Sequence, residues 1–171
     1  AVRVDARLRT TARGVFAIGD VNGIAPFTHA AASQAQWLGD ALLDGRRGPF
    51  DGGPVPHAVF TDPEVGAIGV TEQDLRRRRV PHVSALVRYD ETAMGWAMGE
   101  PTGFAKCLAS PRGEILGFHV VGPHASVLVH QVVPAMRWRN HVSSLTDAMT
   151  VHPALIEVVA DAAWRVLDLL P

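Results

Sequence analysis

Short apolar runs and longer amphipathic stretches alternate along this chain, and they predict a mixture of strands and helices. The apolar run VFAI at residues 15–18 is closed by Gly19-Asp20 and indicates a short buried strand. After a loop at 21–27, residues 28–43 are almost all helix formers, with Thr28 as the expected N-cap. The N-terminal part therefore predicts the order strand, glycine–aspartate turn, loop and helix.

The rest of the chain carries a series of strand patterns followed by helical ones. Strands are expected at 57–60, 66–70, 83–89, 103–108 and 115–121, and a hairpin turn at 111–113 joins the last two. Helices are expected to open at Thr71, to run over 124–139 with a kink at Pro134, and to run over 153–170 with Pro153 near the first position. Strands in a run followed by helices predict an α+β domain with an antiparallel sheet of about five strands flanked by helices.

A change in composition at residues 45–54 predicts a linker. This stretch, GRRGPFDGGP, is rich in glycine and proline, which interrupt regular structure. We place a boundary there and expect one piece at 1–48 and a second at 49–171. A single strand and a single helix cannot bury a core of their own. Residues 1–48 are therefore expected to belong to a larger domain.

Composition and charge narrow the class of protein. The 171 residues are 47% hydrophobic and 19% charged, which excludes a disordered chain. A net charge of −1 provides no general attraction for nucleic acid or for an anionic membrane, and no apolar run approaches the roughly 20 residues of a membrane helix. Residues 1–5 have no apolar signal core. We therefore expect a cytoplasmic protein without a nucleic-acid or membrane partner.

Cysteine and histidine content restricts the chemistry further. Cys107 is the single cysteine, so an internal disulfide, a redox dithiol and a cysteine-rich zinc site are all excluded within this chain. The eight histidines show no metal-ligand spacing with acids or thiols, and we expect no metal site.

Two neighbouring features could contact a ligand. At Gly19-Asp20 the backbone can approach a ligand closely, and the carboxylate can accept hydrogen bonds from a sugar or polyol hydroxyl. The helix start at 28–31 (THAA) leaves accessible N–H groups for an anionic ring or phosphate. Taken alone, the two patterns are also those of an ordinary turn and an ordinary capped helix, which are the commoner explanations.

His152 and Glu157 form a third candidate. With Pro153 at the first helical position, His152 lies just outside the helix, and the chain can fold back so that Glu157 meets one imidazole nitrogen. Such a contact fixes the tautomer and raises the basicity of the other nitrogen, as in an acid–base pair that serves a nucleophile. The alternative is a histidine N-cap with a solvated glutamate.

Five motifs follow one another along the chain: 10–20, 55–72, 103–106 with 115–117, 122–126, and His152-Pro153 with Glu157. Together they resemble the C-terminal part of the pyridine nucleotide–disulfide oxidoreductases, the class I flavoprotein disulfide reductases. The resemblance implies that 1–48 is the C-terminal end of an FAD-binding α/β domain, a strand–helix remnant. It implies that 49–171 is the dimerisation, or interface, domain.

The resemblance also implies cofactors and roles for residues. FAD would occupy a site that is incomplete in this chain, and NAD(P)H would bind elsewhere in the full-length protein. Asp20 would bond the ribityl chain and the 28–31 helix start would face the flavin; the implied flavin-contacting residues are Gly19, Asp20, Thr28, His29 and Ala30. His152, held by Glu157, would relay protons to a cysteine and a thiol substrate in the partner subunit of a homodimer. The His152–Pro153 peptide is expected to be cis, and the 171 residues alone are expected to be inactive.

Within the family, the segments 95–98, 122–126 and 152–155 are most similar to the mycothione reductases, with the dihydrolipoamide dehydrogenases and glutathione reductases next. The implied substrate is a small disulfide of the mycothiol, lipoamide or glutathione type. Val127 replaces a glutamate found in many relatives, which argues against the lipoamide and glutathione types. Two alternatives stay open: a dimerisation module without catalysis, and a family member without thiol chemistry, such as a transhydrogenase or metal-ion reductase.

Overall fold

The computed structural model describes residues 1–45, 48–99 and 102–171. They form two compact units, Ala1–Val55 and Pro56–Pro171, and each is described here by itself. The expected linker at 45–54 includes Arg46 and Arg47, which lie outside the described residues. No helix in the described ranges is long and apolar enough to cross a membrane.

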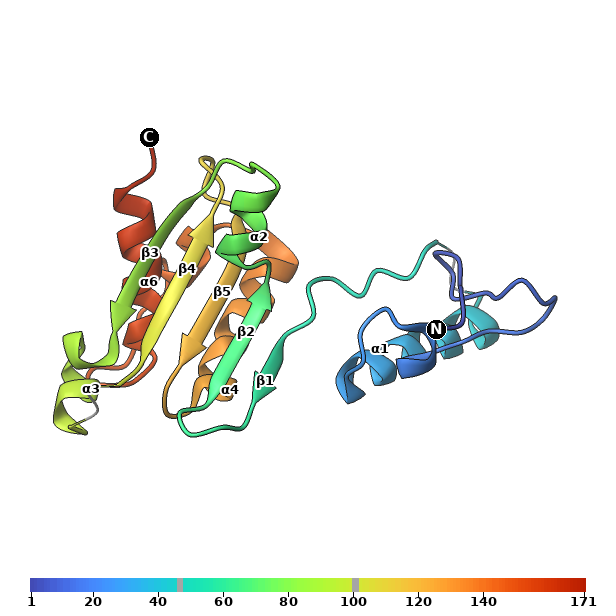
Figure 1. Cartoon of the computed structure of the whole chain (residues 1–171), viewed down its shortest axis with the longest axis horizontal. Helices are drawn as coiled ribbons and strands as arrows, with labels where there is room; N and C mark the ends of the chain where they lie inside the picture. The colour runs from blue at the N-terminus through green and yellow to red at the C-terminus, as the bar shows by residue number, and fades with distance from the viewer. Residues whose placement is uncertain (46–47, 100–101) are drawn as a thin grey trace. The chain divides into compact units, whose positions relative to one another are not determined.

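The second unit is built on one antiparallel sheet with the strand order β1-β2-β5-β4-β3 (Figure 1). The strands are β1 (His57–Val59), β2 (Val65–Gly69), β3 (Val83–Arg88), β4 (Phe104–Ala109) and β5 (Ile115–Val121). In the centre of the sheet, Phe118 of β5 lies opposite Ile68 of β2 and Cys107 of β4. This arrangement confirms the expected α+β class and the five-stranded antiparallel sheet.

Helices flank the sheet in the second unit. They are α2 (Glu72–Arg77), α3 (Ala93–Ala97), α4 (Ala125–Leu128), α5 (Val132–Pro134) and α6 (Glu157–Asp168). Helix α6 packs along β3 and β4, and α4 packs on β2 and β5, whereas α2 lies on the opposite side of the sheet (Figure 1). Thr71 caps α2 by accepting the Asp74 N–H at 3.1 Å, as the sequence predicts.

The core of this unit lies between the sheet and α4–α6. It is lined by sheet residues such as Ile68, Phe118 and Val120 and by helix residues such as Val132 and Val158, all completely buried. Each such apolar side chain stabilises the fold by roughly 1.5–3 kcal/mol relative to exposure. Because Gly66 carries no Cβ, β2 can approach α4 closely; a Cβ there would lie 2.3 Å from the Ala125 carbonyl oxygen.

The expected long helix at 124–139 is wrong in detail. Helix α4 passes into a 3-10 turn at Val129–Gln131, then α5, then a π-helical turn at Ala135–Arg139. Pro134 lies at the junction of α5 and the π-helical turn, where it has no N–H to donate and its ring crowds the preceding turn. A break in the regular hydrogen-bond ladder follows, instead of the kink alone that the sequence predicts.

The last helix also starts later than expected. Helix α6 begins at Glu157, not at Pro153, and residues 152–156 form turns. The Glu157 carboxylate accepts a hydrogen bond from the Ala154 N–H at 2.9 Å. In a helix starting at 153, this N–H would lie in the first turn, where it has no partner within the helix. Arg165 of α6 donates to the Leu86 carbonyl oxygen of β3 at 2.8 Å and pairs with Glu91.

The first unit contains helix α1 (Thr28–Leu43), which has the expected bounds, and a 3-10 turn at Gly19–Asn22. Phe27, not Thr28, occupies the N-cap position, and no side chain caps the helix. Residues 15–18 form no regular strand: a single bridge joins Phe16 to Arg9. A strand needs partners along its length, and in the described unit only the segment around Arg9 provides them.

The chain stays packed on this unit beyond residue 48. Phe50 donates its N–H to the Ala6 carbonyl oxygen at 2.7 Å, and its ring meets Trp37 edge-on at 6.0 Å. These contacts, together with buried Leu8, form a small apolar cluster against α1. The first unit therefore continues to Val55.

Candidate functional site

The structure brings His152 and Glu157 into direct contact. Nδ1 of His152 lies 2.6 Å from Oε1 of Glu157, and the second carboxylate oxygen accepts the Ala154 N–H at 2.9 Å. The imidazole is 70% exposed, whereas the Glu157 side chain is only 17% exposed. The His152–Pro153 peptide is cis, as expected.

The contacts of Glu157 determine how the pair can act. The Ala154 N–H, followed by His152, lowers the pKa of Glu157 below its usual value. An ionised carboxylate only accepts hydrogen bonds, so Nδ1 of His152 carries the proton between the two groups. Nε2 is then the nitrogen left for acid–base exchange on the exposed side of the ring. The arrangement is a base held by an orienting carboxylate, with Glu157 fixed by the backbone.

Cys107 cannot complete this pair as a nucleophile. It lies within β4, it is completely buried, and burial raises the pKa of its thiol to about 12. A thiol is reactive as the thiolate, which is scarce at neutral pH when the pKa is so high. Within the described residues, this unit therefore offers the His152–Glu157 pair no reactive thiol.

The glycine–aspartate turn of the first unit lies against the start of α1. Gly19 is buried and has φ of +74°, and a Cβ added to it would lie 3.4 Å from the Ala31 side chain. Asp20 next to it is exposed, as are Thr28 and His29, whereas Ala30 is buried. The His29 ring stacks on Phe27 with centroids 5.5 Å apart. The turn and the helix start are thus neighbours, with an exposed carboxylate beside them.

A buried polar contact that the sequence analysis missed holds this turn. Oε1 of Gln34 in α1 accepts both the Gly19 N–H and the Asn22 side-chain amide, each at 2.8 Å. Gln34 is 1% exposed and Asn22 is 7% exposed. The available signal was a single glutamine on the otherwise small or apolar inner side of the helix, at residues 30, 34 and 37.

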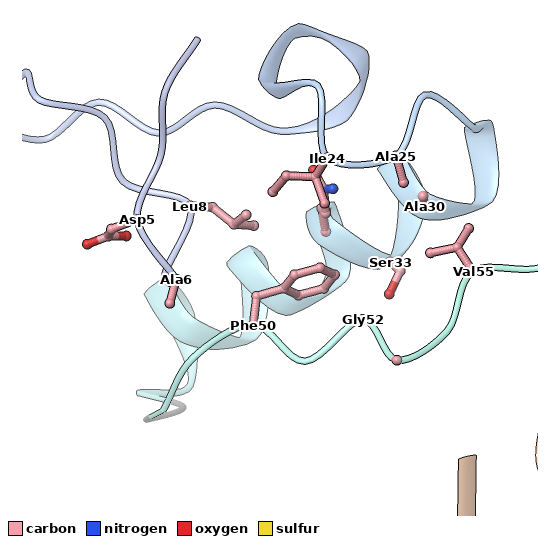
Figure 2. Close-up of a pocket in the computed structure, with 12 residues that line it drawn as sticks. Asp5, Ala6, Leu8, Ile24, Ala25, Ala30, Ser33, Phe50, Gly52 and Val55 are labelled. Atoms are coloured by element: carbon pink, nitrogen blue, oxygen red, sulfur yellow. The ribbon is translucent and has the colours of Figure 1, made fainter. Parts of the chain in front are cut away.

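A cavity of about 250 Å³ lies beside α1 in the same unit (Figure 2). Figure 2 shows Leu8, Ile24 and Phe50 around it, with Val55 at the side of the connecting segment. Ala30 lines this cavity, but Gly19, Asp20, Thr28 and His29 do not. The cavity therefore shares only Ala30 with the ligand-contacting surface that the sequence predicts.

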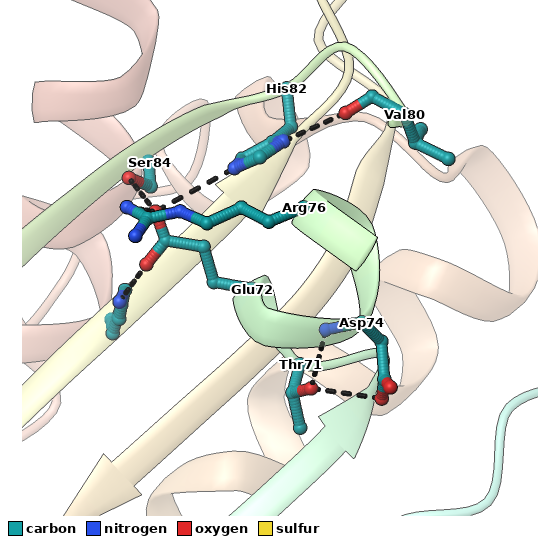
Figure 3. A network of polar contacts seen from close by, with 8 residues as sticks. Thr71, Glu72, Asp74, Arg76, Val80, His82 and Ser84 are labelled. Carbon is teal, nitrogen blue, oxygen red and sulfur yellow. Dashed lines mark hydrogen bonds and ion pairs between the residues drawn. The ribbon is translucent and has the colours of Figure 1, made fainter. Parts of the chain in front are cut away.

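Glu72 is the centre of a polar network on the outer side of the sheet (Figure 3). Its carboxylate pairs with Lys106 of β4 and, at 2.6 Å, with Arg76 of α2; it also accepts the Ser84 hydroxyl at 3.3 Å. Lys106 first, then Arg76, lower the pKa of Glu72 to about 2. The network joins α2 to β3 and β4, and the sequence analysis did not identify it. Across the described ranges, no cluster of three or more His, Cys, Asp or Glu side chains could hold a metal ion.

The sequence of this chain matches one protein family and several known enzymes. Residues 55–163 match the family described as pyridine nucleotide-disulphide oxidoreductase, dimerisation domain. The dihydrolipoyl dehydrogenase of Chlamydia trachomatis is 30% identical over 168 residues, which cover 98% of this chain and 36% of that enzyme. The mycothione reductase of Mycobacterium tuberculosis is 34% identical over 168 residues, which cover 94% of this chain and 37% of that enzyme.

Solved structures agree with the sequence comparison. The crystal structure of LpdA from Mycobacterium tuberculosis superposes with a TM-score of 0.86 at 29% sequence identity, covering 96% of this chain and 36% of that chain. The present chain thus spans about a third of the length of the curated relatives it matches.

Proposed function

The chain belongs to the pyridine nucleotide-disulphide oxidoreductase family, and from this premise we propose that it is the C-terminal part of a flavin-dependent disulfide reductase. Residues 56–171 would be its dimerisation domain and residues 1–55 the end of its FAD-binding domain. The observation that carries the proposal is the 2.6 Å contact of His152 with Glu157. Such a pair has no accessible thiol to serve within this unit, because the single cysteine, Cys107, is buried.

The proposed chemistry at His152 is proton transfer. When a cysteine thiolate attacks a substrate disulfide, it forms a mixed disulfide with one sulfur, and the other sulfur leaves as a thiolate that takes a proton from Nε2 of the imidazolium; the reverse transfer occurs when a thiol is activated. Glu157 is a positioning residue that holds the ring through Nδ1 and stabilises the charged imidazolium. The redox cysteines would come from the partner subunit of a homodimer. Met149 and Val151, which are 101% and 74% exposed just before His152, support contact with another chain.

The first unit fits a flavin in two respects. Gly19 adopts a positive φ and lies against Ala31 of α1, so its backbone is close to the helix and free of a side chain. Asp20 is exposed and could accept hydrogen bonds from ribityl hydroxyls, while Thr28, His29 and Ala30 provide the positive end of a 16-residue helix. FAD, when bound, supplies electron transfer from NAD(P)H to the disulfide.

For the substrate we propose a mycothiol-type disulfide, with the lipoamide and glutathione types as alternatives. Support comes from the segments 95–98, 122–126 and 152–155, from Val127, and from the 34% identity to a mycothione reductase. We also propose a cytoplasmic location, where a thiol pool is kept reduced.

The test uses the protein expressed from its complete gene. We expect bound FAD, a cysteine pair upstream, and NAD(P)H-dependent reduction of mycothiol disulfide in preference to lipoamide and glutathione disulfide. His152→Asn should lower kcat by about 10²-fold to 10⁴-fold, because acid–base assistance is lost. His130→Asn, at another exposed histidine of the same unit, is the matched control and should leave kcat within about twofold. Full activity of the His152 variant would refute the proposed role.

The present chain allows a second test. Equilibrium sedimentation and a flavin absorbance scan on one sample should show a dimer without flavin. A monomer would contradict the dimer assignment. A gene that starts at this N-terminus, with no cysteine pair upstream, would favour a dimerisation module without catalysis.

A further inference from the structure

We propose that Gln34 is the positioning residue of the flavin site, and this inference rests on the proposed function. Its side-chain oxygen joins the Gly19–Asp20 turn to helix α1. The turn would hold the ribityl chain through Asp20, and the start of α1 would meet the flavin ring. The site therefore depends on the spacing between these two segments, which Gln34 sets.

The geometry of the contact is specific. One oxygen, Oε1 of Gln34, accepts two donors at 2.8 Å: the N–H of Gly19, which precedes Asp20, and the side-chain amide of Asn22. The Asn22 amide donates also to the Ala17 carbonyl oxygen at 3.1 Å, and its own oxygen accepts the Ile24 N–H at 2.9 Å. Residues 17–24 are thereby linked, directly through Gly19 or through the Asn22 side chain, to one atom of the helix, Oε1 of Gln34.

Burial makes this contact difficult to replace. Gln34 is 1% exposed, so water cannot easily take the place of its oxygen, and a lost acceptor would leave the Gly19 N–H without its partner and the Asn22 amide with only the Ala17 carbonyl oxygen. Gln34 lies six residues beyond Thr28, which is about 9 Å along the helix axis. Gln34 is thus set back from the helix start, and its described contact with the proposed site is the bond to the Gly19–Asp20 turn.

A neutral amide suits this position better than the alternatives. A methionine of similar length has no comparable acceptor, whereas a carboxyl group buried here without a cation would take up a proton and keep one acceptor oxygen. A purely apolar packing role would not require an oxygen directed at the Gly19 N–H. The atom that accepts, rather than the volume of the side chain, is thus the tested feature.

The experiment compares variants of the protein expressed from its complete gene. Gln34→Met removes the acceptor and keeps the length of the side chain, whereas Gln34→Glu keeps an acceptor oxygen. Gln36→Met is the matched control, because Gln36 is exposed on the same helix and bonds only its neighbour Asp40 among its described contacts. The FAD dissociation constant is measured by titrating apoprotein, with the visible absorption spectrum of bound flavin as a second readout.

We expect Gln34→Met to weaken FAD binding by roughly 10-fold to 100-fold and to shift the flavin absorption bands. Gln34→Glu should recover at least half of that loss on a logarithmic scale, and Gln36→Met should match the wild type. If Gln34→Met does not fold, Asn22→Asp decides, since it removes the amide donor and keeps the oxygen that accepts the Ile24 N–H. Weaker FAD binding with a shifted spectrum in Asn22→Asp supports the inference.

The experiment distinguishes failure of the proposed function from failure of the proposed role of Gln34. A wild-type protein that binds no FAD overturns the proposed function, and this inference with it. A wild-type protein that binds FAD, beside a Gln34→Met or Asn22→Asp variant with unchanged affinity and spectrum, overturns only the role of Gln34. Equal losses in Gln34→Met and Gln34→Glu overturn it as well, because the acceptor would then be irrelevant.

Discussion

Replacement of Glu72 by glutamine should destabilise the second unit in a way that depends on pH. Glu72 lies on the outer side of the sheet, where it pairs with Lys106 and Arg76 (Figure 3). Glutamine keeps the shape of the side chain and removes its charge. The substitution therefore isolates the contribution of the carboxylate.

The size of the effect follows from the pKa. The pKa of Glu72 falls from 4.5 to about 2, first through Lys106 and then through Arg76, and this difference corresponds to an upper limit of roughly 3 kcal/mol. The side chains of Lys106 and Arg76 are 28% and 71% exposed, so solvent screens the pair. We therefore expect a loss of about 1–2 kcal/mol in the free energy of unfolding at pH 7.

The sign of the pH dependence is fixed by the lowered pKa. The folded state binds the Glu72 proton less readily than the unfolded state, so the stabilisation is complete above about pH 5. It declines as the pH falls from 4.5 towards 2. At pH 3, less than about half of the difference between wild type and variant should remain.

Urea unfolding at pH 7 and pH 3, followed by circular dichroism at one protein concentration, measures this difference. Asp147→Asn is the control: Asp147 pairs with Arg139 at 2.8 Å, but both side chains are more than half exposed, and the loss should stay below about 1 kcal/mol. A Glu72→Gln effect that is equal at both pH values would refute the electrostatic reasoning. So would an effect no larger than that of the control.

Three further predictions concern the core of the second unit. Gly117→Ala should cost about 1–3 kcal/mol in urea unfolding, because the new Cβ would lie 2.1 Å from the Val70 carbonyl oxygen; unchanged stability would contradict this close approach. Cys107 should resist a thiol reagent at pH 8 until urea unfolds the chain, since its thiol is buried with a pKa of about 12, and rapid labelling of the native protein would disprove that burial. Tyr89→Phe should lower the free energy of unfolding by about 1 kcal/mol through loss of the 3.0 Å bond to the Pro123 carbonyl oxygen, and a melting temperature equal to the wild type would contradict it.

Elements whose pattern is local were predictable from the sequence. Helix α1 and strand β5 have the expected bounds, because helix formers fill the first and an apolar run between turns fills the second. Boundaries set by non-local contacts were not predictable. Residues 15–18 have a strand pattern but pair only at Phe16, because the described unit offers them no partner beyond the segment around Arg9. The start of α6 was also missed, although the contacts there are local: the helix begins at Glu157, four residues after the expected first position at Pro153.

Contacts at the candidate site and in the Glu72 network were likewise predictable only where the two residues are close in sequence. The His152–Glu157 contact joins residues five apart, and the sequence offered it as one of two possibilities, although the helix position assigned to Pro153 was wrong. The contacts of Gln34 with Gly19 and of Glu72 with Lys106 join residues 15 and 34 apart. Nothing in the local pattern indicates which distant segment such a side chain meets, so these two contacts emerged only from the fold.

The Arg165 side chain also affects whether a further strand can pair with the sheet at the edge formed by β3. Strand β3 pairs with β4 on one side only, so its other edge could recruit a strand from a second molecule and begin aggregation. The guanidinium of Arg165 lies at this strand, bonded to the Leu86 carbonyl oxygen and paired with Glu91. A charged group in that place occupies an acceptor that an incoming strand would need. At the opposite edge, β1 is only three residues long and presents a short template. Both edges of the five-stranded sheet therefore offer a reduced template for pairing with a strand of another molecule.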